Sequence, residues 1–254
     1  MWTPRLAAAE WKNVDATYNR DRAGDGKWDV HKATLPSSWN ITIDQHAFMI
    51  KLTDFGHLGI FAEQRANWLK LAGITAKTGS AREFRILNLF GYTGGSTLAT
   101  AAAGAHVTHV DASKTSNAWA RDNAEIRGLA DKPIRWLTED VKKFIDREIR
   151  RGSCYHGIIL DPPSYGRGNK NEVWKIETDL PPLLEKLASL LADDFAFVLL
   201  SAHSNGYTPL ALENLVQDMV REARGHYEAA EMVIEEVGTG RKLPSGASCL
   251  FERG

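Results

Sequence analysis

The sequence predicts an α/β fold: a mostly parallel sheet with an antiparallel last strand and helices on both faces, preceded by a small N-terminal β-containing appendage. Three observations predict it. From residue 84 onward, short apolar runs alternate with longer segments of helical periodicity, which is typical of a parallel sheet. Residues 236–251 join the last two predicted strands without room for a helix, so these strands should pair antiparallel. Residues 1–80 lack the alternation and hold five of the eight tryptophans.

The first 80 residues carry signals for two short strands and one helix. Residues 39–44 and 48–52 are predicted strands, and apolar residues recur at every second position in the first of them. A helix is predicted over residues 63–72, ended by Gly73, and it leads into the main domain at residues 81–254. Turn signals are found at residues 22–26 and 35–38.

In the main domain each predicted strand is a short apolar run, and each predicted helix follows one of these runs. Strands are predicted over residues 84–90, 106–110, 134–137, 157–160, 195–201 and 232–237, with a seventh at the C-terminal end. One helix is predicted in the alanine-rich segment that ends near residue 103. The other helices are predicted over residues 115–127, 141–150, 182–191 and 209–223.

Composition excludes several classes of protein. The chain has 254 residues, 43% of them apolar, and a formal net charge of −1, so a disordered or collagenous chain is excluded. The longest strongly apolar stretch, residues 195–200, is far shorter than the roughly 20 residues that a membrane-spanning helix needs. The two cysteines and scattered histidines give no metal-ligand spacing. Glu10 interrupts the first apolar run too early for a secretory leader, and we expect a cytoplasmic protein.

Chemistry-bearing residues follow the first four strands of the main domain. In an open parallel sheet, ligands bind beyond the carboxyl ends of the strands, near the point where strand order reverses. The first strand is followed by a glycine-rich turn at residues 91–95, the second by Asp111 and the third by Glu139 and Asp140. The glycines allow a close approach to a ligand, and Asp111 suits two ribose hydroxyls. The turn lacks the G-x-G-x-x-G spacing of dinucleotide-binding dehydrogenases.

The fourth strand leads directly into Asp161-Pro162-Pro163. Two prolines rigidify the backbone and remove amide donors, so the carbonyl groups and the Asp161 side chain are left as acceptors. An exocyclic amine could be held there by its hydrogens while its lone pair faces an electrophile. The alternative is a turn that only blocks a helix.

These motifs resemble those of class I S-adenosylmethionine-dependent methyltransferases, and within them the group related to the large-subunit ribosomal RNA methyltransferases. The resemblance is carried by ILNLFGYTGGSTL at 86–98, VDASK at 110–114, DNAEIRGL at 122–129, ED at 139–140 and ILDPPSYGRG at 159–168. The segment FGHLGIFAEQRANW at 55–68 is similar to the one that precedes the first strand and closes over the cofactor in these enzymes. The resemblance implies a seven-stranded Rossmann-like methyltransferase sheet, with residues 1–80 as appendage and cofactor-covering segment and residues 81–254 as the S-adenosyl-L-methionine-binding catalytic domain.

The resemblance also implies a set of site residues. Asp111 would hold the ribose hydroxyls, Ala112 would pack on the adenine, and Asp140 would accept from the adenine amino group beside the Val141 backbone. The methionine and ribose portion would be wrapped by Phe90, Gly91, Tyr92, Thr93, Gly94 and Gly95.

Further residues would lie near the methionine end and the transferred methyl. His57 and Gln64 would lie at the methionine end, although His57 equally suits a packed, hydrogen-bonded histidine. Asp161 and Pro162 would face the methyl group. Tyr165 is a candidate for the wall on which a flipped base stacks, and so is Trp174; both also suit the core.

The leading functional prediction is methylation of RNA, at a ribosomal RNA base nitrogen or another atom that needs no covalent catalysis. Cytosine-5 chemistry is disfavoured because no cysteine stands near Ser201, where such relatives carry one, and both Cys154 and Cys249 suit structural roles. Two alternatives stay open: a small-molecule methyltransferase or other S-adenosylmethionine-consuming biosynthetic enzyme, and a non-catalytic binding protein with a vestigial pocket. The basic run at residues 141–152 suits either phosphate contacts or a solvated helix face. No membrane or metal partner is predicted.

Overall fold

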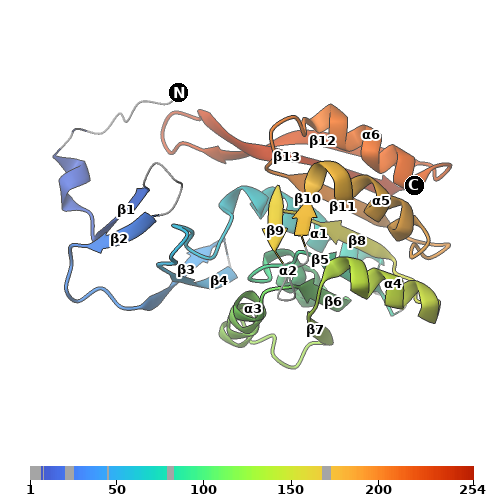
Figure 1. Ribbon diagram of the computed structural model, residues 1–254, viewed down its shortest axis with the longest axis horizontal. Helices are drawn as coiled ribbons and strands as arrows, with labels where there is room; N and C mark the ends of the chain where they lie inside the picture. Colours follow the sequence, from blue (N-terminus) through green and yellow to red (C-terminus); the bar gives the residue numbers. More distant parts are fainter. Residues whose placement is uncertain (1–6, 8, 21–25, 45, 79–82, 168–172) are drawn as a thin grey trace. The chain divides into compact units, whose positions relative to one another are not determined.

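The computed structural model describes residues 7, 9–20, 26–44, 46–78, 83–167 and 173–254. The chain divides into two compact units, Met1–Ile60 and Phe61–Gly254. In Figure 1 the smaller unit is blue and the larger one runs from cyan through green to red. The smaller unit is built from hairpins, whereas the larger one contains the long sheet.

The smaller unit holds a short helix, η1 (Glu10–Asn13), and two antiparallel hairpins. The second hairpin, β3 (Ser38–Ile43) with β4 (His46–Lys51), confirms the two predicted strands. The first hairpin, β1 (Ala16–Arg20) with β2 (Gly26–Val30), was not predicted, and most of its turn signal lies outside the described residues.

Aromatic residues stabilise the first hairpin. The rings of Tyr18 and Trp28 pack with centroids 5.2 Å apart across the two strands. The Trp28 indole N–H donates to the carbonyl of Thr53 at 2.8 Å, and the Tyr18 hydroxyl donates to that of Asp54 at 2.8 Å. Several of the N-terminal aromatic residues therefore serve to join the hairpin to the loop after β4.

The larger unit is organised around a seven-stranded sheet in the order β12-β13-β11-β8-β5-β6-β7. The neighbours from β11 to β7 are parallel, and β13 is antiparallel to both β11 and β12, as predicted. The strands are β5 (Arg85–Leu89), β6 (His106–Asp111), β7 (Ile134–Thr138), β8 (Gly157–Leu160), β11 (Phe197–Ala202), β12 (Gly225–Glu235) and β13 (Lys242–Arg253).

Helices cover both faces of this sheet (Figure 1). Alternate residues of a strand point to opposite faces. Leu87 therefore joins the core under α4 (Val141–Arg151), α5 (Ile176–Ala188) and α6 (Pro209–Val220), whereas Ile86 joins the core on the other side. The helices on that second side are η2 (Ala62–Gln64), α1 (Arg65–Thr78), α2 (Gly95–Ala102) and α3 (Lys114–Ile126).

The prediction that a helix ends at Gly73 is wrong, because α1 continues to Thr78. Gly73 lies on the exposed side of α1, while the next turn buries Ile74 and Thr75 against the core. The Thr75 hydroxyl donates to the carbonyl of Leu71 at 2.7 Å. Burial of the following turn therefore outweighs the weak helix propensity of one glycine, which is about 1 kcal/mol.

Replacement of Gly73 by Ala is expected to stabilise the larger unit by about 0.5–1 kcal/mol, because alanine has the higher helix propensity. A Cβ at this position meets no atom within 4 Å. Urea unfolding measures the change. Gly104→Ala is the matched control: Gly104 follows α2 with φ of +102°, so alanine there should destabilise. A loss of stability in Gly73→Ala would show that the helix is interrupted at this residue.

Two other predicted boundaries are also wrong. Helix α5 begins at Ile176, six residues before Pro182, and contains Pro181 and Pro182. Both prolines are exposed, so the carbonyls that lose an intrahelical partner can face water, while Leu180 and Leu183 are buried.

Strand β12 begins at Gly225, seven residues earlier than the predicted start at 232. β12 is an edge strand, and the side chains of its first half are largely polar and exposed. The run of apolar residues that would predict a strand is therefore weak there.

A short hairpin follows β8 before α5 begins. Strand β9 (Tyr165–Arg167) pairs antiparallel with β10 (Val173–Lys175). The buried Trp174 ring packs on Phe90 with centroids 4.9 Å apart, and its indole N–H donates to the carbonyl of Pro163 at 2.7 Å. The hairpin therefore fixes the Asp-Pro-Pro segment from outside the sheet.

Candidate functional site

The predicted site residues of the larger unit stand at one edge of the sheet. Strands β8, β5, β6 and β7 are consecutive neighbours and parallel, so their carboxyl ends meet at the same edge. The chain runs from β5 outward to β6 and β7, then returns to β8 on the other side of β5. Strand order therefore reverses between β5 and β8, where open α/β sheets bind ligands.

The glycine-rich turn after β5 has an unusual backbone. Phe90 and Tyr92 adopt φ of 57° and 48°, in the left-handed region that residues other than glycine seldom enter. The amide of Gly91 donates to the carbonyl of Val110 at 3.2 Å, which ties the turn to β6. Strained backbone of this kind collects at binding sites, where surrounding structure maintains it.

Gly91 is required because the turn passes directly over a histidine. A Cβ at Gly91 would lie 2.4 Å from the imidazole of His109, which is fully buried on β6. The His109 Nδ1 is 2.8 Å from the hydroxyl of Thr97, and the amide of Asn88 donates to that hydroxyl at 2.8 Å. Burial, and secondarily the charge of Arg121, lowers the pKa of His109 to about 3. His109 is therefore a neutral support beneath the turn.

Asp111 at the end of β6 organises the same turn. Its Oδ2 accepts from the amide of Tyr92 at 2.9 Å, and its Oδ1 accepts from the amide of Ser113 at 2.8 Å. Burial raises the pKa of Asp111, and the two amides act in the opposite direction. Each carboxylate oxygen can accept further hydrogen bonds. This pair of acceptors therefore fits a ligand that offers two hydroxyl groups, as the ribose of a nucleoside does.

Asp140 caps the helix that follows β7. Its Oδ1 accepts from the amide of Lys143 at 3.0 Å, and its other oxygen has no such role in the cap. Glu139 differs because its carboxylate pairs with Arg147. Val141 is buried, and Ala112 is half-buried beside Asp111. Of the two acidic residues after β7, Asp140 is thus held by the cap of its own helix, whereas Glu139 is held by an ion pair.

Asp161 follows β8 and is held by two side chains from distant elements. The hydroxyl of Ser201 donates to its Oδ1 at 2.7 Å, and the amide of Gln64 donates to its Oδ2 at 3.0 Å. Burial raises the pKa of Asp161, while His203, Ser201 and Gln64 oppose that effect in this order. The next residue, Pro162, is buried. The carboxylate is therefore fixed in one orientation.

A buried polar network continues from Asp161 across to β13. The Gln64 amide also donates to the Ser201 hydroxyl at 3.0 Å, and its carbonyl accepts from Asn67 at 2.7 Å. The hydroxyl of Ser248 on β13 donates to Asn67 at 3.3 Å. Sequence reasoning missed Ser201 and Asn67 because each stands among apolar or helical neighbours. A polar residue inside an otherwise apolar strand was the available signal for Ser201.

The two candidates for a stacking wall differ in the structure. Tyr165 is exposed at half of its surface, next to the Asp-Pro-Pro segment. Trp174 is buried and committed to Phe90 and the Pro163 carbonyl, so it belongs to the core. Tyr165 alone of the two can offer a ring face to a ligand.

His57 belongs to the smaller unit, Met1–Ile60. Its side chain is exposed, and its carbonyl accepts from the Thr53 hydroxyl at 2.7 Å. The role predicted for His57 at the methionine end stays a prediction.

The basic run on α4 is largely engaged in ion pairs. Lys142 pairs with Asp179 at 3.1 Å, Arg147 pairs with Glu139, and Arg151 pairs with the buried Glu148 at 3.0 Å. This pattern favours a solvated amphipathic helix face over a set of phosphate ligands.

Both cysteines have structural surroundings, although Cys249 pairs with Leu200 and therefore lies level with Leu160 at the carboxyl end of β8. Cys154 precedes β8, where its sulfur accepts from the Arg85 guanidinium at 3.0 Å. Cys249 is buried in β13, and burial, with a smaller effect of Glu213, raises the pKa of its thiol to about 12. Neither thiol is placed to attack a ligand at the site edge. Among the described residues, no group of three or more histidine, cysteine or acidic side chains is arranged to hold a metal ion.

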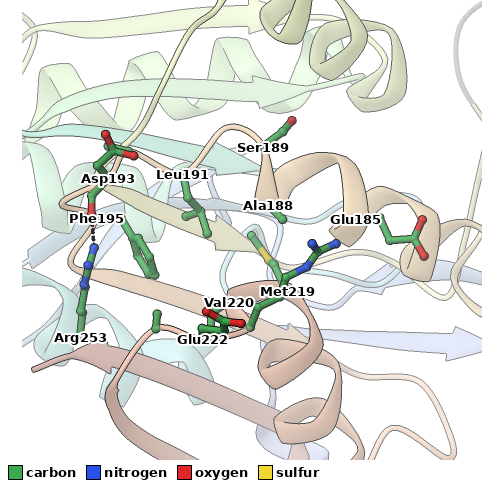
Figure 2. Close-up of a pocket in the computed structure, with 13 residues that line it drawn as sticks. Glu185, Ala188, Ser189, Leu191, Asp193, Phe195, Met219, Val220, Glu222 and Arg253 are labelled. Atoms are coloured by element: carbon green, nitrogen blue, oxygen red, sulfur yellow. Dashed lines mark hydrogen bonds between the residues drawn. The ribbon is translucent and has the colours of Figure 1, made fainter.

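A separate pocket lies at the opposite end of the sheet, by the amino end of β11 (Figure 2). Phe195, Met219 and Arg253 line it, and the Arg253 guanidinium donates to the carbonyl of Asp193. The pocket thus does not include the strand ends that carry the predicted site. In the part of the chain that the structure describes, no helix is long and apolar enough to span a membrane.

Comparison with known proteins assigns the chain to a family. A family model described as S-adenosylmethionine-dependent methyltransferase matches residues 6–226. The chain belongs to this methyltransferase family. The Rossmann-like methyltransferase sheet expected from the sequence is thereby confirmed, and S-adenosyl-L-methionine is the cofactor of the family.

A crystal structure of a methyltransferase from Agrobacterium tumefaciens is similar to nearly the whole chain. It is 38% identical with a TM-score of 0.92, and the match covers 99% of this chain and 81% of that one. The ribosomal RNA large subunit methyltransferase K of Neisseria meningitidis is 31% identical over 180 residues, which are 70% of this chain and 48% of the relative. The K/L enzyme of Shewanella loihica is 34% identical over 57% of this chain and 19% of its own length. The chain therefore spans less than half of the length that these curated relatives have.

Proposed function

We propose that this methyltransferase transfers a methyl group from S-adenosylmethionine to a nitrogen of an RNA base. The observation that carries the proposal is the order of acceptor groups along one sheet edge. The Gly91 turn, Asp111 and Asp140 follow β5, β6 and β7, and Asp161 follows β8 across the reversal point.

The cofactor supplies an activated methyl on a sulfonium sulfur. The chain's own residues would bind and orient it: Asp111 accepts from the ribose hydroxyls, and Asp140 accepts from the adenine amino group. The backbone of residues 90–94 would surround the methionine portion, and Gln64 would lie nearby. Because the methyl is already activated, alignment of the reacting groups is the main task of the protein.

Asp161 would hold the acceptor nitrogen. Its carboxylate is fixed by Ser201 and Gln64, and the next residue, Pro162, is buried. Prolines at 162 and 163 offer no amide donors, and the carbonyl of Pro163 already accepts from Trp174, which leaves the carbonyl of Pro162 as an acceptor. An amino group is therefore oriented by its hydrogens, with its lone pair directed toward the methyl. No cysteine is available for covalent attack on a ring carbon, which supports a nitrogen acceptor.

Two observations favour RNA over a small metabolite as the acceptor: the names of the curated relatives, and the exposed ring of Tyr165. The curated relatives from Neisseria and Shewanella are named as ribosomal RNA methyltransferases. Tyr165, four residues after Asp161, is half exposed, as needed to stack a base that has left its helix.

Transfer of tritiated methyl groups to total cellular RNA tests the proposal. The enzyme is incubated with labelled S-adenosylmethionine and either RNA or a metabolite extract. Label in RNA, located in modified nucleosides after digestion, is the expected result. Label only in small molecules would refute the RNA acceptor, and label in neither fraction, with no calorimetric binding of the cofactor, would favour a vestigial pocket.

Replacement of Asp111 by Ala is expected to weaken S-adenosylmethionine binding by at least about 100-fold, because the two hydrogen bonds that ribose would donate to this charged acceptor contribute about 1.5–3 kcal/mol each. Isothermal titration calorimetry measures the dissociation constant. Asp131→Ala, an exposed acidic residue in the loop before β7, is the control and should bind normally. Equal affinities in the two variants would remove Asp111 from the ribose site.

A further inference from the structure

Beside Asp161 stands a histidine that neither the motifs nor the comparisons assign. His203 follows β11, the next strand along the sheet edge from β8. Its Nε2 lies 3.6 Å from Asp161 Oδ1, and one third of its side chain is exposed. It is therefore reachable by a molecule that enters the site.

The tautomer of His203 is determined by the neighbouring strand. Its Nδ1 is 2.8 Å from the carbonyl oxygen of Ser245 on β13. A carbonyl only accepts, so Nδ1 carries a hydrogen, and in the neutral ring the lone pair is on Nε2. The close approach requires Gly246: a Cβ there would lie 2.9 Å from His203 Nδ1 and 2.8 Å from the Ala202 carbonyl.

Two carboxylates and one aromatic ring surround the imidazole. Glu63 Oε1 lies 3.7 Å from Nδ1, and Asp161 Oδ1 faces Nε2 on the opposite side. The Phe61 ring packs on His203 with centroids 5.7 Å apart, and the same ring packs on Tyr92 of the cofactor turn at 5.4 Å. These groups come from η2, β8 and the segment before η2, so the histidine is positioned at the border between the turn and Asp161.

The distance between His203 Nε2 and Asp161 Oδ1 allows one ligand atom to contact both. At 3.6 Å the two atoms are too far apart for a good hydrogen bond, yet a single N–H-bearing group could lie within bonding distance of both. Asp161 would accept one hydrogen of that group, and the Nε2 lone pair would accept another. Glu63 and Asp161 would then stabilise the positive charge of the imidazolium that forms.

We propose that His203 is a catalytic proton acceptor for the nitrogen that is methylated. This inference rests on the proposed function and adds to it a group that removes the proton. The acceptor nitrogen forms a bond to the methyl carbon as the sulfur–methyl bond breaks, with its electron pair going to sulfur. The nitrogen, now positively charged, gives one proton to His203 Nε2, and the imidazolium later returns it to water. The acceptor is therefore an amino or ring nitrogen that carries hydrogen.

The first test is kinetic. His203→Gln keeps a polar side chain of similar reach but is not a base, so kcat at pH 7.5 is expected to fall about 100-fold, the usual effect of removing a general base. The affinity for S-adenosylmethionine, measured by calorimetry, should stay within about twofold. The wild-type rate should fall on acidification, and this acidic limb should vanish in the variant. His226→Gln, an exposed histidine on β12, is the control and should behave as wild type.

The second test varies the charge behind the histidine. Glu63→Gln removes the carboxylate near Nδ1, so the imidazolium is less stabilised and the acidic limb of the rate profile should move to lower pH, with a lower kcat. A His203→Gln variant with full kcat, or one that keeps the acidic limb, would overturn the proposal.

Nitrogen-15 NMR of the ligand-free protein gives a readout without catalysis. At pH 8 the His203 ring should show a protonated Nδ1 and an unprotonated Nε2. The opposite tautomer would refute the inference whatever the acceptor is. Absence of labelled RNA with the predicted tautomer would instead refute the RNA acceptor, so the two failures are distinguishable.

Discussion

Replacement of Asp161 by Asn is expected to lower kcat for methyl transfer by about 100- to 1,000-fold, the range observed when one preorganised group at a reacting centre is removed. Affinity for S-adenosylmethionine should change by less than about threefold. The asparagine amide would place a donor where the carboxylate accepts, and Ser201 and Gln64 already donate into the same space. The hydrogens of an acceptor amine would then face donors, and its lone pair would lose its alignment with the methyl.

Single-turnover transfer of labelled methyl groups and calorimetry with the cofactor separate the two effects. Asp218→Asn, on an exposed turn of α6, is the matched control and should retain wild-type values. Thermal unfolding of each variant checks that the fold persists. If Asp161→Asn bound the cofactor poorly but turned over normally once saturated, Asp161 would belong to the cofactor site and not to the acceptor site.

The sequence predicts the strand ends well because the information there is local. Gly91, Asp111, Asp140 and Asp161 each follow directly on an apolar run, and parallel strands bring their carboxyl ends to one edge. Six of the sheet strands could be placed from their apolar runs, and the short final connection indicated the antiparallel pairing of β12 with β13.

What sequence reasoning missed depends on contacts between distant segments. Gln64 and Asp161 are 97 residues apart, and Ser201 lies in another strand, so their meeting is set by topology and not by a local pattern. The tautomer of His203 likewise depends on a carbonyl of β13.

Errors in helix boundaries have a similar cause. Gly73 and Pro182 are weak or unfavourable helix residues, yet each lies on an exposed face while its neighbours are buried. Tertiary packing therefore overrides local propensity at both positions.

Acid is expected to destabilise the larger unit through His109. The pKa of His109 is about 3 in the folded state, because of burial first and the charge of Arg121 second, and it is near 6.5 in an unfolded chain. Between these values the unfolded chain binds a proton that the folded chain does not. Stability is thus full above pH 6.5 and falls as the pH drops toward 3, by about 1.4 kcal/mol per unit and about 5 kcal/mol in all.

Urea unfolding at several pH values measures this slope, and His109→Gln is expected to remove most of it. The control is His106→Gln, an exposed histidine on the same strand, which should leave the slope unchanged. An equal slope in wild type and His109→Gln would show that other groups cause the acid sensitivity. Because the ring of His109 packs beneath Gly91, protonation would act first on the turn that we propose to bind the cofactor. Cofactor affinity should therefore decline at a higher pH than global unfolding in the wild type, and this separation should shrink in His109→Gln.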